Sequence, residues 1–298
     1  MSSNGIPLVF IHIGDAPPGY VATAIQQARK WNPTCPIVFI SSVHTDEEFA
    51  DEERVLLSRI PMSPNHVKFM DNTKLDSEWR GGFWRATTER LFILEDWMRW
   101  KGIKECLHLE NDVMLYTDIS ALVPTLRLTS AGLSTTFQGQ GVRQDQIRMC
   151  FSILYCRSID ALSNFVASLA VNNRGTDEMQ LSGPYWQDNP EECSVLPTAP
   201  PGATLVSETF RGWYENTAFP CIFDAAAHGQ YLGGIDPIHS GAGVSFVNRD
   251  TDYRSDQFLY GWAVDSAQRR YPTLVDKVGK IWPIANLHVH SKRLDDFS

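Results

Sequence analysis

Apolar residues follow two patterns in the first third of the chain: short continuous runs, and longer stretches in which they recur every three or four positions. Residues 6–13 and 36–41 are continuous apolar runs, which are typical of buried strands. Residues 20–31 have helical spacing, and Asn32-Pro33 ends that helix. The same criteria predict helices over 46–60, 83–100 and 158–171, and strands over 66–70, 105–109, 131–137, 150–155, 244–247 and 286–290.

This alternation of strands and helices predicts an α/β fold, with a mainly parallel central sheet and helices on both of its faces. The C-terminal half is less regular, and residues 188–202 contain four prolines, which indicates a loop. No internal repeat, low-complexity tract or linker divides the chain. We therefore expect one domain over residues 1–298.

Composition narrows the class of protein. The chain has 298 residues, of which 43% are hydrophobic and 20% charged, as in an ordinary globular protein. Its net charge of −9 disfavours nucleic-acid binding, which needs a basic surface. No apolar run approaches the roughly 20 residues that span a bilayer, and no positive charge precedes the first apolar run as in a signal peptide. The six cysteines are scattered and form no CxxC pair, so we expect a cytoplasmic protein without disulfides.

The strongest local motif is Glu110-Asn111-Asp112, directly after an apolar strand. Ligands bind at the carboxyl ends of parallel strands, which is where this motif lies. Alternate side chains of an extended chain share one side, so both carboxylates can face one point. Carboxylate oxygens in this arrangement suit Mg²⁺ or Mn²⁺. The alternative is an ordinary acidic turn.

A second motif, 287–292, alternates apolar and polar residues as a half-buried strand does. This alternation places His288 and His290 on one side, where a neutral imidazole can complete a metal site with the acidic pair. Lys292 can offset the charge of a phosphate. The alternative is an edge strand with solvated histidines.

Two further segments carry carboxylates. Asp177 and Glu178 either begin a helix, where acidic residues are favoured, or provide a general base. Residues 223–237 are rich in small residues, which allow close approach of backbone or ligand. They form either a tight helix or a turn that lines a pocket, with Asp236 or His239 reaching in.

The stretch before the acidic motif contains two arginines of interest. Arg85, near a helix N-terminus, can meet an anionic ligand. Arg90 is expected to form helix-surface pairs with Glu89 and Glu95. The chain contains no GxGxxG, GxxxxGK[ST] or GxSxG motif, so no Rossmann fingerprint, P-loop or nucleophile elbow is supported.

Taken together, these segments resemble the nucleotide-sugar-dependent glycosyltransferases of GT-A fold. The resemblance covers most of the chain except residues 183–219. Residues 230–234 and 288–292 look like motifs of a bacterial and large-virus polysaccharide branch. The segments that carry the rest of the resemblance are residues 9–14, 28–33, 83–92 and 110–112.

The resemblance implies a nucleotide-binding half over 1–115 and an acceptor half over 116–298. It implies that Asp112 binds Mn²⁺, or Mg²⁺, and that Glu110 supports the site through the metal or the ribose. The family usually has Asp where this chain has Glu110. The remaining implied roles are His288 or His290 as a metal ligand, Ser291 and Lys292 at the diphosphate, and His12, Gly14, Ser41 and Arg85 at the base and ribose.

The implied activity is metal-dependent transfer of a hexosyl or pentosyl group from a UDP-sugar to a hydroxyl of a glycan, in polysaccharide biosynthesis. A divalent cation stabilises the diphosphate leaving group, and a carboxylate deprotonates the acceptor. We favour an inverting reaction, in which Asp177, Glu178 or Asp236 is the base.

Three alternatives remain. A sugar-nucleotide nucleotidyltransferase would carry a cationic, glycine-rich loop after its first strand, whereas residues 14–19 contain no cation. A non-catalytic sugar- or nucleotide-binding module would tolerate loss of Asp177 and Glu178. A hydrolase would use the paired histidines as its metal site.

Overall fold

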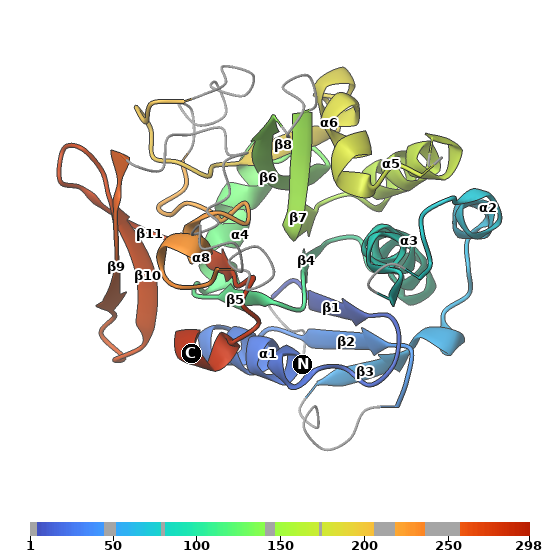
Figure 1. Cartoon of the computed structure of the whole chain (residues 1–298), viewed down its shortest axis with the longest axis horizontal. Coiled ribbons are helices and arrows are strands. Elements are labelled where there is room, and N and C mark those ends of the chain that lie inside the picture. The colour runs from blue at the N-terminus through green and yellow to red at the C-terminus, as the bar shows by residue number, and fades with distance from the viewer. Residues whose placement is uncertain are drawn as a thin grey trace.

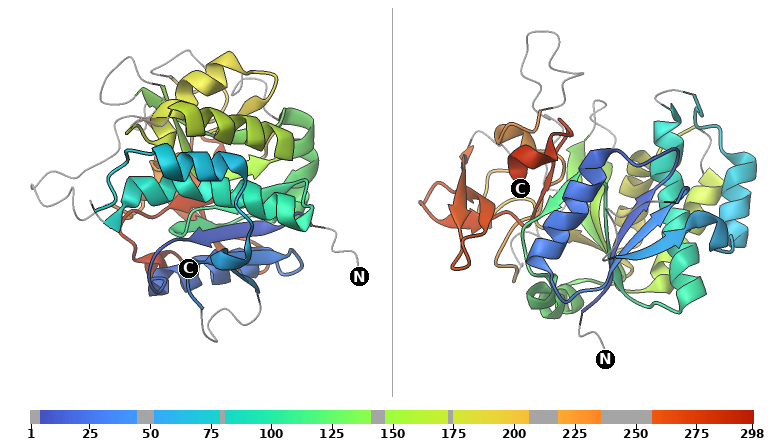
Figure 2. Two further views of the ribbon diagram at one scale, coloured as in Figure 1. Left: turned by 90° about the vertical axis from the view of Figure 1, so that its right-hand side faces the viewer. Right: turned by 90° about the horizontal axis from the view of Figure 1, so that it is seen from below.

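The computed structural model describes residues 5–44, 52–78, 81–140, 147–172, 175–205, 218–235 and 257–298. Within these ranges a seven-stranded sheet lies at the centre, with helices on both faces (Figures 1 and 2). A three-stranded antiparallel sheet stands to one side, and a two-stranded ladder joins the middle of the chain to its C-terminal segment. None of the described helices is long and apolar enough to cross a membrane.

The central sheet has the order β3-β2-β1-β4-β7-β6-β8. Its strands are β1 (Leu8–His12), β2 (Ile37–Ser41), β3 (Glu53–Leu56), β4 (Cys106–Leu109), β6 (Leu133–Gln140), β7 (Ile147–Cys156) and β8 (Cys193–Leu196). Neighbouring strands are parallel except where β7 meets β4 and β6. The predicted mainly parallel sheet is therefore confirmed, with β7 alone running against the other strands.

The other elements cover the sheet or extend it. The helices are α1 (Gly19–Trp31), α2 (Pro64–Asn72), α3 (Phe83–Lys101), α4 (Ile119–Thr129), α5 (Ile159–Asn172), α6 (Glu178–Asp188) and α8 (His228–Tyr231), with 3-10 turns η2 (Leu57–Arg59) and η5 (Leu294–Phe297). The strands outside the central sheet are β5 (Val113–Leu115), β9 (Leu259–Val264), β10 (Arg270–Val275), β11 (Ile281–Pro283) and β12 (Asn286–His288).

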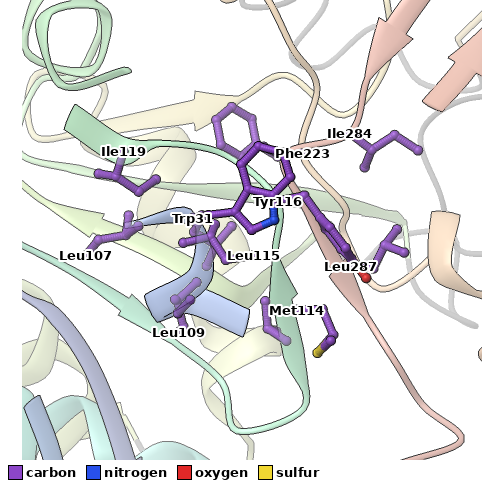
Figure 3. Close-up of a cluster of buried hydrophobic side chains, with 14 of the residues drawn as sticks. Trp31, Leu107, Leu109, Met114, Leu115, Tyr116, Ile119, Phe223, Ile284 and Leu287 are labelled. Atoms are coloured by element: carbon purple, nitrogen blue, oxygen red, sulfur yellow. The ribbon is translucent and has the colours of Figure 1, made fainter. Parts of the chain in front are cut away.

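Two hydrophobic cores lie on opposite faces of the sheet. Leu8 and Phe10 of β1 point into a first core with α1, α4, β5 and the C-terminal segment, part of which Figure 3 draws. Val9 and Ile11 point into a second core with α3 and α5. Because both faces of β1 are buried, its sequence is apolar without alternation.

Two predicted elements are wrong, and one expected loop contains a strand. Within the expected helix 46–60, residues 53–56 form β3 and 57–59 form η2, because β3 pairs with β2 along the sheet edge. Residues 45–51 lie outside the described part. The expected strand 66–70 lies inside α2, where Ser63 caps the helix and Pro64 occupies its first position. The expected loop 188–202 contains β8. The expected strand 244–247 lies outside the described residues.

Helix α6 crosses β7 at a glycine. A Cβ atom on Gly183 would lie 1.9 Å from the carbonyl oxygen of Ile147, so the two elements have no room for a side chain. We expect Gly183→Ala to lower the free energy of unfolding by about 2 kcal/mol or more, because either α6 or β7 must move. Urea denaturation measures this difference.

The matched control is Gly19→Ala at the first position of α1, where an added Cβ meets no atom within 4 Å. Its effect should stay within about 0.5 kcal/mol. Equal stability of the two variants would show that the close crossing at Gly183 is wrong.

A buried histidine joins α2 to α3. The Nδ1 of His66 lies 2.6 Å from Asp96 Oδ2, and its Nε2 lies 3.6 Å from Glu89 Oε1. Burial lowers the pKa of His66, but the two carboxylates outweigh burial and raise it to about 9. The folded protein therefore holds the imidazolium at neutral pH.

This raised pKa predicts a loss of stability at alkaline pH. Because the pKa of His66 is higher in the folded state than its ordinary 6.5, its contribution is complete below pH 6.5. The contribution is lost as the pH rises through about 9. Between pH 6.5 and 9.5 the unfolding free energy of wild type should fall by up to about 3 kcal/mol relative to His66→Gln. Urea titrations at several pH values check this, and parallel pH profiles of the two proteins would contradict it.

Candidate metal centre

The acidic motif forms the turn between β4 and β5. The N–H of Val113 donates to the carbonyl of Glu110 at 3.1 Å, so the motif is a tight turn and not the extended segment that the sequence predicts. The side-chain amide of Asn111 donates to the carbonyl of Ile11 at 2.8 Å and ties the turn to the end of β1. Glu110 and Asp112 therefore lie on a turn that is anchored at the carboxyl end of the sheet.

Strand β12 brings a histidine to this turn. β12 pairs antiparallel with β5, with His288 opposite Val113, and the N–H of Val289 donates to the carbonyl of Asp112 at 2.9 Å. The Nε2 of His288 lies 3.0 Å from Asp112 Oδ2, and its Nδ1 lies 3.4 Å from Glu110 Oε2. One potential ligand atom from each of these three residues lies within 4.8 Å of the other two. Within the described ranges, no other group of three or more His, Cys, Asp or Glu residues meets this condition.

Positive charges flank both carboxylates. Arg90 of α3 pairs with Glu110, and Lys292 pairs with Asp112. Burial raises the pKa of Glu110, but Arg90 and His288 outweigh burial and hold it at about 2. Glu110 is therefore ionised at every pH at which the protein would be studied.

Lys292 reaches Asp112 through a turn after β12. Its backbone has a φ of 59°, and its N–H donates to the carbonyl of Val289 at 3.0 Å. The ammonium group also lies 5.7 Å from the ring centroid of Tyr20, at the start of α1. The hydroxyl of Ser291 accepts the N–H of Arg293 at 3.4 Å. The turn thus places a cation beside the carboxylate cluster.

A buried carboxylate that the sequence analysis did not select holds the histidine strand in place. Asp224 is fully buried, and its Oδ2 accepts the N–H groups of His288 at 3.0 Å and Gly229 at 3.1 Å. A Cβ on Gly229 would lie 2.6 Å from the carbonyl oxygen of His288. The signal in the sequence is an aspartate before small residues and a helix start, as in a helix cap. Asp236 and His239 lie outside the described residues.

The two carboxylates at the start of α6 differ in environment. Asp177 caps the helix by accepting the N–H of Gln180 at 3.0 Å, and burial raises its pKa. Glu178 is buried, accepts the hydroxyl of Thr88 at 2.7 Å, and lies 3.6 Å from Arg90. Burial raises the pKa of Glu178 to about 7, against the opposing effect of Arg90. Asp177 therefore initiates the helix, and Glu178 next to it is a carboxyl group with a raised pKa.

The expected surface pairs of Arg90 are wrong. Arg90 is 8% exposed and lies between Glu110 and Glu178, because this face of α3 packs against the end of the sheet. Glu89 faces His66 instead, and Glu95 pairs with Arg99. Arg90 thus connects the cluster of Glu110, Asp112 and His288 to the start of α6.

Three residues expected at the base and ribose lie at the ends of β1 and β2. The Nε2 of His12 contacts the carbonyl of Asp15 at 2.8 Å, and the N–H of Gly14 donates to Ser42 Oγ at 3.2 Å. Ser41 lies at the end of β2 on a cavity of about 250 Å³, which Arg54 also lines. These residues lie on the same edge of the sheet as the acidic turn, because the parallel strands β1, β2 and β4 all end there.

Two predicted residues lie outside the ligand cluster. Arg85 directs its guanidinium to Met70 Sδ of α2, at 3.6 Å. His290 stacks on His288 with a centroid separation of 4.5 Å, and its Nε2 contacts the carbonyl of Ala226 at 3.3 Å. Of the two predicted histidines, His288 is therefore the one whose nitrogens face the carboxylates.

The cluster has the chemistry of a divalent-cation site. It offers two carboxylates and an imidazole, which suit Mn²⁺ or Mg²⁺, and the Nδ1 of His288 is buried without a hydrogen bond. This nitrogen lies 3.4 Å from Glu110 Oε2, which is close enough for an ion pair but does not form a hydrogen bond. The residues present fit a cation.

No protein-family model matches the chain, and no curated protein matches its sequence. Solved structures similar to it include mouse xyloside xylosyltransferase 1 in its apo form, at 11% identity and a TM-score of 0.48, over 72% of this chain and 95% of that one. LgtC galactosyltransferase in complex with donor and acceptor sugar analogues is 12% identical, with a TM-score of 0.42 over 72% and 84%. PaToxG glycosyltransferase is 10% identical, with a TM-score of 0.42 over 62% and 70%.

Proposed function

We propose that the protein is a metal-dependent glycosyltransferase, which moves a sugar from a nucleoside-diphosphate sugar to a hydroxyl of a glycan acceptor. The observation that carries the proposal is the convergence of Glu110, Asp112 and His288 beside Lys292. Mg²⁺ and Mn²⁺ held by few protein ligands keep positions free for phosphate oxygens. A cation site with an adjacent ammonium group therefore suits a diphosphate.

The charges of the site favour departure of that diphosphate. A bound cation would supply Lewis-acid stabilisation of the leaving group. The side chain of Lys292 is 41% exposed and pairs with Asp112. If a cation binds Asp112 instead, the ammonium group of Lys292 can leave that carboxylate and pair with a phosphate oxygen. Because charge on the leaving oxygen grows as the glycosidic bond breaks, these groups bind the transition state more tightly than the substrate.

The acceptor needs a base, and Glu178 is our candidate together with Asp177 and Asp236. A carboxyl with a pKa of about 7 is well matched to proton transfer near neutral pH. A catalytic base on the side opposite the leaving group corresponds to inversion of the sugar's configuration.

We place the nucleobase and ribose of the donor at His12, Gly14 and Ser41, with UDP as the nucleotide. Transfer to a growing polysaccharide is the proposed setting.

The test is isothermal titration of UDP and of GDP, each with and without Mn²⁺. We expect one nucleotide to bind only with Mn²⁺, which identifies the base of the donor. Hydrolysis or transfer of the matching sugar nucleotides then identifies the sugar. Absence of binding by both nucleotides under both conditions would contradict the proposal. Binding without transfer to any acceptor would favour a non-catalytic module.

A further inference from the structure

Glu110 and Asp112 approach opposite nitrogens of the same imidazole. Oδ2 of Asp112 lies 3.0 Å from Nε2 of His288, whereas Oε2 of Glu110 lies 3.4 Å from Nδ1. The two ring nitrogens point in different directions, so one ion cannot bond to both. An ion bound at Nε2 would therefore have Asp112 as the carboxylate next to that nitrogen, whereas Glu110 lies beside the opposite nitrogen.

The groups that already hold each carboxylate decide which of the two can be released to an ion. Glu110 is bound at Oε1 by Arg90, whose side chain is 10% exposed and also lies 3.6 Å from Glu178. Arg90 cannot leave Glu110 without stranding buried charge. Asp112 is bound by Lys292, whose side chain is 41% exposed and can turn towards solvent. Asp112 is thus the carboxylate that can be released to an ion.

The other nitrogen of His288 needs a partner. Nδ1 is buried and makes no hydrogen bond in the structure, and Oε2 of Glu110 is the carboxylate oxygen next to it. Histidines that bind metals usually donate their second N–H to a carboxylate or carbonyl, which fixes the tautomer and the ring orientation. Glu110 is placed to accept that proton after a small movement.

We propose that Glu110 is a positioning residue and not a ligand of the cation: it accepts the Nδ1 proton of His288 and so directs Nε2, together with Asp112, at the ion. This inference rests on the proposed metal-dependent function. It assigns different tasks to two carboxylates that lie two residues apart. It also gives Arg90 a task, since Arg90 fixes the carboxylate that orients the histidine.

The test counts the water molecules on bound Mn²⁺ by electron–nuclear double resonance in H₂O and D₂O, without nucleotide. If Glu110 is not a ligand, Glu110→Gln keeps the wild-type number of waters, whereas Asp112→Asn gains one. The Mn²⁺ affinity of Glu110→Gln should fall about tenfold, which is typical of a lost partner behind a metal-bound histidine. Coupling from one histidine nitrogen should persist in Glu110→Gln and disappear in His288→Ala.

Two controls keep the result interpretable. Glu53→Gln changes an exposed glutamate on β3 and should leave both water number and affinity unchanged. If Glu110→Gln does not fold, Glu110→Asp keeps the charge that Arg90 pairs with but withdraws the oxygen from Nδ1, so the same tenfold loss and unchanged water number are expected.

Two outcomes would overturn the inference. An extra water on Mn²⁺ in Glu110→Gln, with affinity as low as that of Asp112→Asn, would make Glu110 a ligand and leave the proposed function intact. If none of these measurements detects Mn²⁺ binding to the wild-type protein, both the inference and the metal-dependent function are refuted.

Discussion

Replacing Asp112 with Asn should lower kcat/KM for sugar transfer by about a thousandfold or more, equivalent to about 4 kcal/mol of transition-state stabilisation. The substitution removes the anionic oxygen that lies 3.0 Å from His288 Nε2, at the carboxylate we expect to bind the ion. It preserves the shape of the turn, since the backbone carbonyl of Asp112 still accepts the N–H of Val289. Steady-state kinetics over a range of Mn²⁺ concentrations measures the loss.

The control for this variant is Asp296→Asn, which makes the same change at a carboxylate that is 57% exposed and pairs with Arg293 on the surface. Its kinetics should match wild type. Transfer by Asp112→Asn within tenfold of wild type, with unchanged Mn²⁺ dependence, would exclude Asp112 from the metal site.

Removal of Arg90 should have the largest effect on stability outside the hydrophobic cores. Arg90→Ala removes the cation that pairs with the half-buried Glu110 and also takes the guanidinium away from the buried Glu178. We expect the free energy of unfolding to fall by about 3–5 kcal/mol, the usual cost of breaking a buried ion pair on one side. Urea denaturation at pH 7 measures it.

The pH dependence of this loss provides a second check. Glu178 has a pKa of about 7 in the intact protein, so it carries a proton at pH 5 and the penalty there should be smaller than at pH 8. Arg293→Ala removes an arginine whose side chain is 73% exposed and should cost at most about 1 kcal/mol. Equal stability of the two arginine variants would show that Arg90 does not neutralise buried carboxylates.

The parts of the fold that the sequence predicts correctly are those determined by local pattern. α1 has helical spacing and stops at Asn32, and β1 and β2 are continuous apolar runs because sheet and helices cover both of their faces. The acidic turn and the histidine strand are identifiable for a related reason. Glu110, Asp112 and His288 directly follow or alternate with apolar residues, which makes their polarity conspicuous.

The parts that the sequence does not predict depend on contacts between distant segments. β3 becomes a strand because it pairs with β2, although its own residues also suit a helix. In the sequence, Arg90 has the pattern of a surface residue, and only the tertiary contact between α3 and the turn after β4 brings it to Glu110. Asp224 accepts backbone N–H groups from both α8 and β12, and the sequence does not show that these two segments meet at this residue. The division into halves at residue 115 stays a prediction.

The antiparallel pairing of β12 with β5 has a consequence for the timing of biosynthesis. Lys292 contacts Asp112 across 180 residues of chain, and His288 reaches the same turn from the same segment. On the ribosome, the acidic turn emerges long before the residues that complete it. Under the proposed function, Asp112 lacks the histidine of the cation site until residues 286–292 have been synthesised, so a growing chain cannot complete that site before this segment emerges.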